Sequence, residues 1–261
     1  MRRLFTFGCS FTEYAWPTWA DILSKDYDFF LNYGKSGAGN MYISAAVAEA
    51  SIANNFNKDD TVAVMWTNCT REDRYLNNGW QSYGNIYTAK KPYELSEDWI
   101  TKYITPRGCY VRDFANIHLT KKLLDSIGCK YIMFKMVDFE SWDQYTNAKT
   151  ENIKDILEHY KETILAVKLS VHKTVFNYNW YCKNPWKIIG ADQRPDAHPT
   201  PKEHLEYLKL VLDYQPSGAV NDWVEKIDKE VIALFPKGNI SKAPSKIYDW
   251  DYFASKPRFK L

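Results

Sequence analysis

The 261-residue sequence has no long hydrophobic run, no excess of one charge and few cysteines. No stretch approaches the roughly 18 apolar residues that a transmembrane helix needs, so we expect no membrane span. The 34 basic and 32 acidic side chains nearly balance, which argues against a dedicated nucleic-acid binder. The five cysteines are odd in number and form no CxxC pair, which disfavours a disulfide framework and a zinc site. They are Cys9, Cys69, Cys109, Cys129 and Cys182.

The amino terminus carries only the beginning of a signal-peptide pattern. Arg2 and Arg3 precede the apolar run LFTF, but polar residues follow at once. A signal peptide needs roughly 7–15 apolar residues at this point. We therefore expect a buried first strand in a cytoplasmic protein with reduced thiols. The abundance of Asn, Lys and Tyr favours a bacterial or phage origin.

An alternation of strand and helix patterns is present along most of the chain. Strand-like apolar runs occupy residues 3–7, 26–34, 61–66 and 129–139. Helical patterns occupy residues 16–23, 45–53, 111–128, 151–168, 201–214 and 219–235. Thr200 to Glu203 form a capping box with Pro201 at the first helical position, so a helix is expected to begin there. The alternation predicts an α/β fold with a mostly parallel sheet and helices on both faces.

Domain organisation follows from where this periodicity is lost. Residues 71–107 are rich in Tyr, Asn, Gly and Trp and too long for an ordinary connection. We predict a single α/β domain over residues 1–235, with an aromatic-rich insertion at about 71–110. Residues 236–261 are expected to form a C-terminal tail.

Four loops contain the residue types that serine hydrolysis needs. Reactive groups in parallel sheets collect at the carboxyl ends of the strands. Those loops contain Gly8-Cys9-Ser10, Ser36-Gly37-Ala38, Thr67-Asn68 and Asp196-Ala197-His198. A nucleophile, a base, an acid that orients the base and donors for an oxyanion can all come from these loops.

The order of these blocks resembles the SGNH (GDSL-like) hydrolase superfamily, from the first strand to the helix after His198. The matching segments are GCSFT, NYGKSGAGN, MWTN and DAHP. The resemblance implies a flavodoxin-like three-layer α/β/α sandwich that forms an acyl-enzyme without a cofactor or metal. It implies that Ser10 is the nucleophile, His198 the base and Asp196 the orienting acid. The N–H groups of Ser10 and Gly37 and the amide of Asn68 would form the oxyanion hole.

Two positions depart from the family pattern. Cys9 stands where the family usually has the Asp of GDS, and Asp196 stands two residues before His198 instead of three. The D-x-H spacing is similar to that of SGNH-like polysaccharide O-acetyltransferase domains, including those that act on alginate. It leaves open whether Asp196 pairs with His198 and whether water or a sugar hydroxyl accepts the acyl group.

We predict a serine ester hydrolase that acts on an O-acyl, in particular an O-acetyl, ester of a carbohydrate. One alternative is a polysaccharide O-acetyltransferase with the same residues, and the other is a non-catalytic glycan-binding or structural protein. The partner is then a small-molecule or glycan ester, and not a nucleic acid or a membrane. The oligomeric state is left open.

Structural roles compete with the catalytic ones at the central positions. Ser10 fits a helix cap, Gly37 a turn with positive φ, and Asn68 a loop amide that satisfies backbone groups. Cys9 is a second candidate nucleophile. His204 is expected to be a packed or capping histidine rather than a second base or a metal ligand.

Three residues of the insertion are candidates for substrate binding. Trp80 and Tyr83 can stack on sugar rings, as can the other aromatic residues of the segment, or they can form a satellite core or an oligomer contact. Arg71 can bind an anionic group of the substrate or form a surface ion pair with a nearby acid.

Overall fold

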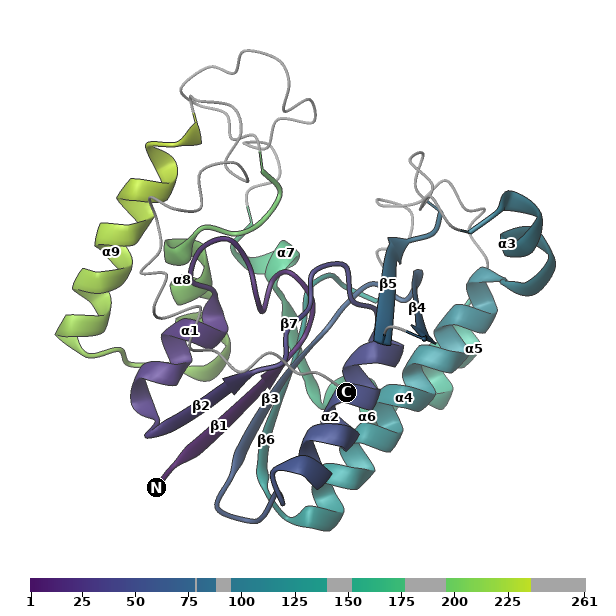
Figure 1. Ribbon diagram of the computed structural model, residues 1–261, viewed down its shortest axis with the longest axis horizontal. Coiled ribbons are helices and arrows are strands. Elements are labelled where there is room, and N and C mark those ends of the chain that lie inside the picture. The colour runs from purple at the N-terminus through teal and green to yellow at the C-terminus, as the bar shows by residue number, and fades with distance from the viewer. Residues whose placement is uncertain (78, 88–94, 140–151, 177–195, 236–261) are drawn as a thin grey trace.

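The computed structural model describes residues 1–77, 79–87, 95–139, 152–176 and 196–235 (Figure 1). The expected C-terminal tail and Cys182 lie outside the described residues. The four described cysteines are buried free thiols. Within the described part of the chain, no helix is both long enough and apolar enough to cross a bilayer.

A five-stranded parallel sheet forms the centre of the fold, in the order β2-β1-β3-β6-β7. Its strands are β1 (Arg3–Phe7), β2 (Phe29–Asn32), β3 (Thr61–Trp66), β6 (Lys130–Lys135) and β7 (Val167–Ser170). All six residues of β3 are buried. This burial explains its continuous apolar sequence, because a central parallel strand is covered on both faces.

Helices cover both faces of this sheet (Figure 1). One face carries α1 (Trp19–Leu23), α8 (Pro201–Leu212) and α9 (Gly218–Ile232). The other carries α2 (Asn40–Ala53), α4 (Pro106–Ile127), α5 (Lys154–His159) and α6 (Lys161–Leu165). Two short elements, η1 (Ser24–Asp26) and α7 (Val171–Thr174), complete this part of the chain. The predicted three-layer α/β/α arrangement is confirmed.

Local capping signals account for several helix boundaries. The capping box of Thr200 and Glu203 is present, and α8 begins at Pro201 as predicted. Gly128 ends α4 in the left-handed conformation at φ 75°, where a side chain would be strained. Thr18 caps α1 through a second capping box.

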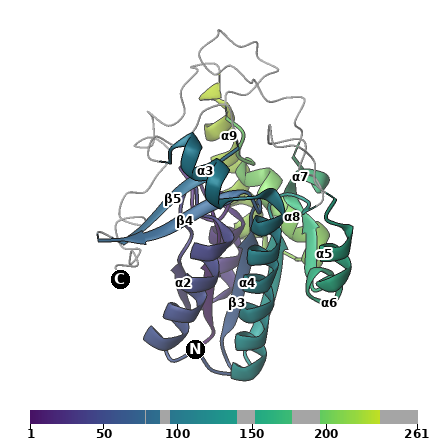
Figure 2. The ribbon, with the colours of Figure 1, turned by 90° about the vertical axis from the view of Figure 1, so that its right-hand side faces the viewer.

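The region predicted as an irregular insertion at about 71–110 has regular structure. It forms an antiparallel hairpin, β4 (Arg71–Leu76) and β5 (Gly79–Asn85), followed by α3 (Glu97–Tyr103). The hairpin lies against one end of α2 in both views (Figure 2). The helix expected from residue 111 begins earlier, at Pro106, and Thr105 is its cap. Pro at the first helical position and a Thr cap are the local signals for that start.

The prediction of a single helix over residues 151–168 was wrong. The structure has two short helices there, with a break at Tyr160, and then strand β7. Val167 pairs with Met133 of β6, so the last residues of the expected helix extend the sheet. Strand pairing with a distant segment outweighs the weak local helical pattern.

Candidate active site

The turn after β1 holds Ser10 at the carboxyl edge of the sheet. The carbonyl of Cys9 accepts a hydrogen bond from the N–H of Thr12 at 2.9 Å, which closes the turn. A Cβ at Gly8 would lie 2.0 Å from the Thr12 hydroxyl oxygen, so the turn leaves no room for a side chain there. The cap of α1 is Thr18, and Ser10 is therefore not a helix cap.

Ser10, His198 and Asp196 form one hydrogen-bonded line. The hydroxyl oxygen of Ser10 lies 2.8 Å from Nε2 of His198. Nδ1 of His198 lies 2.7 Å from Oδ1 of Asp196. A carboxylate at Nδ1 favours the tautomer with its proton on Nδ1, which leaves Nε2 free to accept the proton of Ser10. The structure thus brings together the three residues that the sequence proposed as a triad.

Asp196 is held by three donors. Oδ1 accepts from Nδ1 of His198 and, at 2.8 Å, from the backbone N–H of the same residue. Oδ2 accepts from the hydroxyl of Tyr14 at 2.5 Å. Burial works to raise the pKa of Asp196, but these hydrogen bonds outweigh it, and the pKa lies below the usual 3.8. Asp196 is therefore an anion across the neutral range.

Tyr14 is a site residue that the sequence reasoning missed. Its ring stacks on His198 with centroids 3.6 Å apart and planes at 16°. Phe11 packs on the same imidazole at 5.3 Å. Trp16 donates from its indole N–H to the carbonyl of Pro199 at 2.7 Å, which fixes the loop just after His198. These aromatic contacts restrict the orientation of the imidazole.

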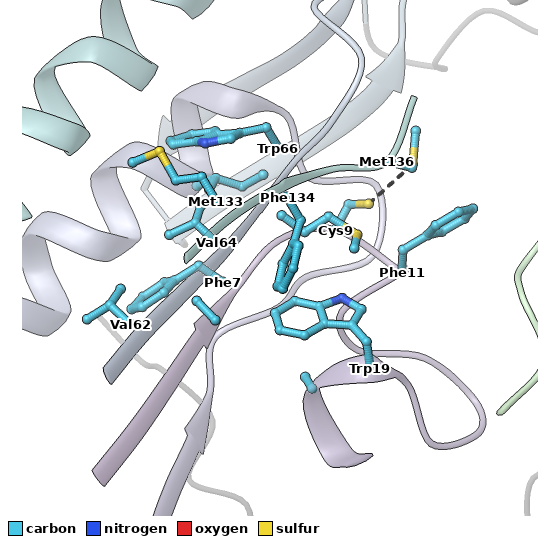
Figure 3. Packing of buried hydrophobic residues seen from close by; sticks show 14 of the residues in the cluster. Phe7, Cys9, Phe11, Trp19, Val62, Val64, Trp66, Met133, Phe134 and Met136 are labelled. Atoms are coloured by element: carbon cyan, nitrogen blue, oxygen red, sulfur yellow. Dashed lines mark hydrogen bonds between the residues drawn. The ribbon is translucent and has the colours of Figure 1, made fainter. Parts of the chain in front are cut away.

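Cys9 faces away from the triad. Its side chain is fully buried in the main hydrophobic core, and its sulfur lies 3.5 Å from the sulfur of Met136 (Figure 3). Neighbouring side chains in the turn diverge, so only Ser10 reaches His198. His204 is buried in the first turn of α8, with its ring edge-on to Phe11 at 6.4 Å. The expectation of a packed histidine is met.

The two loops proposed to complete an oxyanion hole flank Ser10. Ser10 follows β1, Gly37 follows β2 and Asn68 follows β3, and β1 lies between the other two strands. Gly37 adopts φ 77°, the left-handed conformation that glycine favours. Oδ1 of Asn68 accepts from the N–H of Thr70 at 2.7 Å and from the Thr70 hydroxyl. The amide is thereby oriented with Nδ2 left to donate elsewhere.

Three donors at this edge of the sheet have no acceptor among the described residues. They are the N–H of Ser10, the N–H of Gly37 and Nδ2 of Asn68. Ser10 and Asn68 are nearly buried, with 5% and 8% of their surface exposed. Polar groups in such positions are normally hydrogen-bonded, so unused donors beside a nucleophile are available for a ligand.

A buried polar network holds these loops in place. Oδ1 of Asp73 accepts from the N–H of Gly39 at 2.9 Å, so the hairpin fixes the loop that contains Gly37. Asn40 connects that loop to the next one. Its Oδ1 accepts from the N–H of Thr67 at 2.9 Å, and its Nδ2 donates to the carbonyl of Thr67 at 3.1 Å. The loops on either side of Ser10 are therefore rigidly linked.

The proposed substrate-binding residues all lie on the hairpin. Trp80 is half-buried and packs edge-on against Tyr42 of α2 at 5.8 Å and Tyr75 at 5.6 Å. Trp80 thereby packs against the edge of the main hydrophobic core. Tyr83 is half-buried at the irregular register of β5. Arg71 donates to the carbonyl of Ala38 at 2.9 Å, directly beside Gly37.

No protein-family model matches the chain, and no curated protein matches its sequence. Solved structures that are similar include a candidate acylhydrolase from Bacteroides fragilis, with 14% identity and TM-score 0.42 over 85% of this chain and 88% of that chain. A GDSL-like lipase from Bacteroides thetaiotaomicron has 15% identity and TM-score 0.41 over 85% and 88%. A member of the lipolytic G-D-S-L family from Veillonella parvula has 14% identity and TM-score 0.43 over 80% and 97%.

Proposed function

We propose that the protein is an SGNH-type serine ester hydrolase. The observation that carries this proposal is the line from Ser10 through His198 to Asp196, with contacts of 2.8 Å and 2.7 Å. The unused donors of Ser10, Gly37 and Asn68 support it. A non-catalytic glycan-binding protein has no need for an oriented imidazole on a serine hydroxyl, so the geometry favours catalysis.

The reaction then follows from the positions of the protons. The Ser10 oxygen attacks the ester carbonyl while Nε2 of His198 takes its proton. The negative charge of Asp196 stabilises the imidazolium, and the Ser10, Gly37 and Asn68 donors stabilise the oxyanion. His198 returns the proton to the leaving alcohol, which leaves an acyl group on Ser10. Water then attacks the acyl carbon and gives a proton to His198. The bond to the Ser10 oxygen breaks, His198 returns the proton to that oxygen, and the acid is released.

The finer part of the proposal is the substrate, an O-acetyl ester on a carbohydrate. This substrate class is supported by the aromatic residues of the β4–β5 hairpin. The hairpin contacts the loop of Gly37 through Asp73. The exposed Tyr75 and the half-buried Trp80 lie together on that hairpin, and aromatic faces bind sugar rings. An O-acetyltransferase would use the same acyl-enzyme with a sugar hydroxyl in place of water. Product analysis with and without an added sugar distinguishes the two.

Labelling with a fluorophosphonate, read by intact mass, tests the proposal without knowledge of the substrate. We expect one adduct on the wild type, none on Ser10→Ala, and strongly slowed labelling of His198→Ala. Cys9→Ala is the control for the neighbouring nucleophile and should still be labelled. Urea unfolding of each variant verifies that it is folded. A folded wild type that takes no label would refute the activated serine.

A further inference from the structure

Arg71 is a cation beside the proposed active site with no carboxylate partner among the described residues. Nη1 donates to the carbonyl of Ala38 at 2.9 Å, and Nη2 lies 3.7 Å from the sulfur of Met136. A guanidinium presents five N–H donors in a planar fork, and these two contacts leave most of them available. The half-buried position reduces the screening of its charge by water.

The acids adjacent to Arg71 in β4 are engaged elsewhere. Glu72 binds Arg112 and Arg74, each at 2.6 Å. Asp73 accepts from two N–H groups at the start of α2 and from the hydroxyl of Ser82. Arg74 has a second contact, with its guanidinium 5.0 Å over the ring of Trp99. Arg71 is thus the arginine of this hairpin whose charge is not compensated within the described chain.

Shared contacts place the guanidinium next to the loops that follow β1, β2 and β3. Ala38 directly follows Gly37, one of the proposed oxyanion donors. The Met136 sulfur that Arg71 approaches also lies 3.5 Å from the sulfur of Cys9 and 3.7 Å from the hydroxyl of Thr67. Cys9 precedes Ser10, and Thr67 precedes Asn68. Arg71 therefore contacts two residues, Ala38 and Met136, that adjoin the loops of Gly37, Ser10 and Asn68.

We propose that Arg71 forms an anion subsite and that the natural substrate is an ester that bears a carboxylate close to the ester bond. This inference rests on the proposed esterase function and names its substrate class. A guanidinium binds a carboxylate through two parallel hydrogen bonds, which gives orientation as well as affinity. The carboxylate can belong to the alcohol part or to the acyl part of the ester.

Matched pairs of esters that differ in one charge test the proposal. For the alcohol part, the pair is 3-acetoxybenzoate and 3-acetoxybenzamide. For the acyl part, it is phenyl monoadipate and its neutral monoamide. The measured quantity is the ratio of kcat/KM for the anionic ester to kcat/KM for the neutral one. We expect the wild type to prefer the anionic member of one pair, and that pair identifies the part that carries the charge.

Substitutions of arginine test whether Arg71 binds the carboxylate of the substrate. Arg71→Gln should lower the anionic-to-neutral ratio by about tenfold or more, as for one lost charge-assisted hydrogen bond pair. Arg71→Lys should retain part of the preference, since it keeps the charge but loses the fork. Arg74→Gln removes a compensated arginine from the same hairpin and should leave the ratio unchanged. An equal ratio in wild type and Arg71→Gln would overturn the subsite and leave Arg71 a structural support of Ala38.

A binding measurement separates failure of the subsite from failure of the esterase. In Ser10→Ala, which cannot form an acyl-enzyme, 3-hydroxybenzoate should bind more tightly than 3-hydroxybenzamide in an NMR titration. The preference should disappear in Ser10→Ala/Arg71→Gln and weaken with added salt. The subsite is overturned if Ser10→Ala binds 3-hydroxybenzoate no more tightly than 3-hydroxybenzamide, and adipate no more tightly than its monoamide. This holds even if fluorophosphonate labelling succeeds. A retained preference without labelling upholds the subsite and refutes the esterase.

Discussion

The hydroxyl of Tyr14 provides a direct test of how the imidazole of His198 is tuned. Tyr14→Phe removes the donor that lies 2.5 Å from Oδ2 of Asp196 and keeps the ring that stacks on His198 at 3.6 Å. The other carboxylate oxygen, Oδ1, still accepts both hydrogen bonds from His198. The variant therefore isolates one hydrogen bond.

The size of the effect follows from the charge of the acceptor. A hydrogen bond to a charged group contributes about 1.5–3 kcal/mol, and the Asp196 side chain is 19% exposed, so we take the lower end of this range. The pKa of Asp196 should therefore rise, because its anion loses one hydrogen bond. With one donor fewer, the carboxylate attracts the proton of His198 more strongly. We expect the acid limb of the kcat/KM profile to move to higher pH, with a loss of up to about tenfold in kcat/KM at the optimum.

The assay is the pH dependence of kcat/KM for 4-nitrophenyl acetate, with the rate of fluorophosphonate labelling as a second readout. Tyr131→Phe is the matched control, because Tyr131 donates to Asp125 at 2.6 Å on the exposed surface. That variant should leave the profile unchanged. Tyr14→Leu removes the stacked ring as well and should cost on the order of 10²-fold, as for a misplaced catalytic group. An acid limb that stays in place or moves to lower pH in Tyr14→Phe would refute the reasoning.

Two further predictions concern the loops and the buried network. Asn68→Asp keeps the acceptor for Thr70 but loses the Nδ2 donor, so kcat should fall on the order of 10²–10³-fold or more while urea unfolding stays close to the wild type; an unchanged kcat would remove Asn68 from the oxyanion hole. Burial raises the pKa of Asp113 to about 7 against the opposing effect of Arg112. The unfolded value is about 3.9, so the folded state binds more protons between these values, and stability should fall as pH rises through the window. Asp113→Asn should lack this pH dependence. If the difference in unfolding free energy between the wild type and Asp113→Asn stays constant between about pH 5 and 8, the raised pKa of Asp113 is contradicted.

The central sheet could be predicted because its signals are local. The strand β3 (Thr61–Trp66) matches its apolar run residue for residue, and the start of α8 at Pro201 matches its capping box. The hairpin β4–β5 was missed, since its polar sequence REDRYL has no apolar alternation. Its stability comes from buried partners far along the chain. Glu72 binds Arg112 of α4, and Asp73 binds the start of α2. No local pattern predicts such pairing.

The site shows the same division between local and distant information. Ser10 could be proposed because it follows the first strand, and Asp196 and His198 because they stand just before a capped helix in a familiar order. Tyr14 could not, because its hydrogen bond to Asp196 joins residues 182 positions apart. The contacts of Arg71 could not be predicted from the sequence either. The sequence suggested an ion pair with a neighbouring acid, whereas the structure pairs those acids with other groups.

The D-x-H spacing is explained by a local turn at Asp196. Oδ1 of Asp196 accepts the backbone N–H of His198, the residue two positions on, which is the hydrogen bond of an Asx turn. The same oxygen then meets Nδ1 of the His198 ring at 2.7 Å. An acid two residues before the base can therefore orient it, provided that the turn brings ring and carboxylate to the same side. Oδ2 remains free for a donor from another element, and Tyr14, in the loop that presents Ser10, supplies it. The short spacing thereby couples the loop of the nucleophile to the loop of the base.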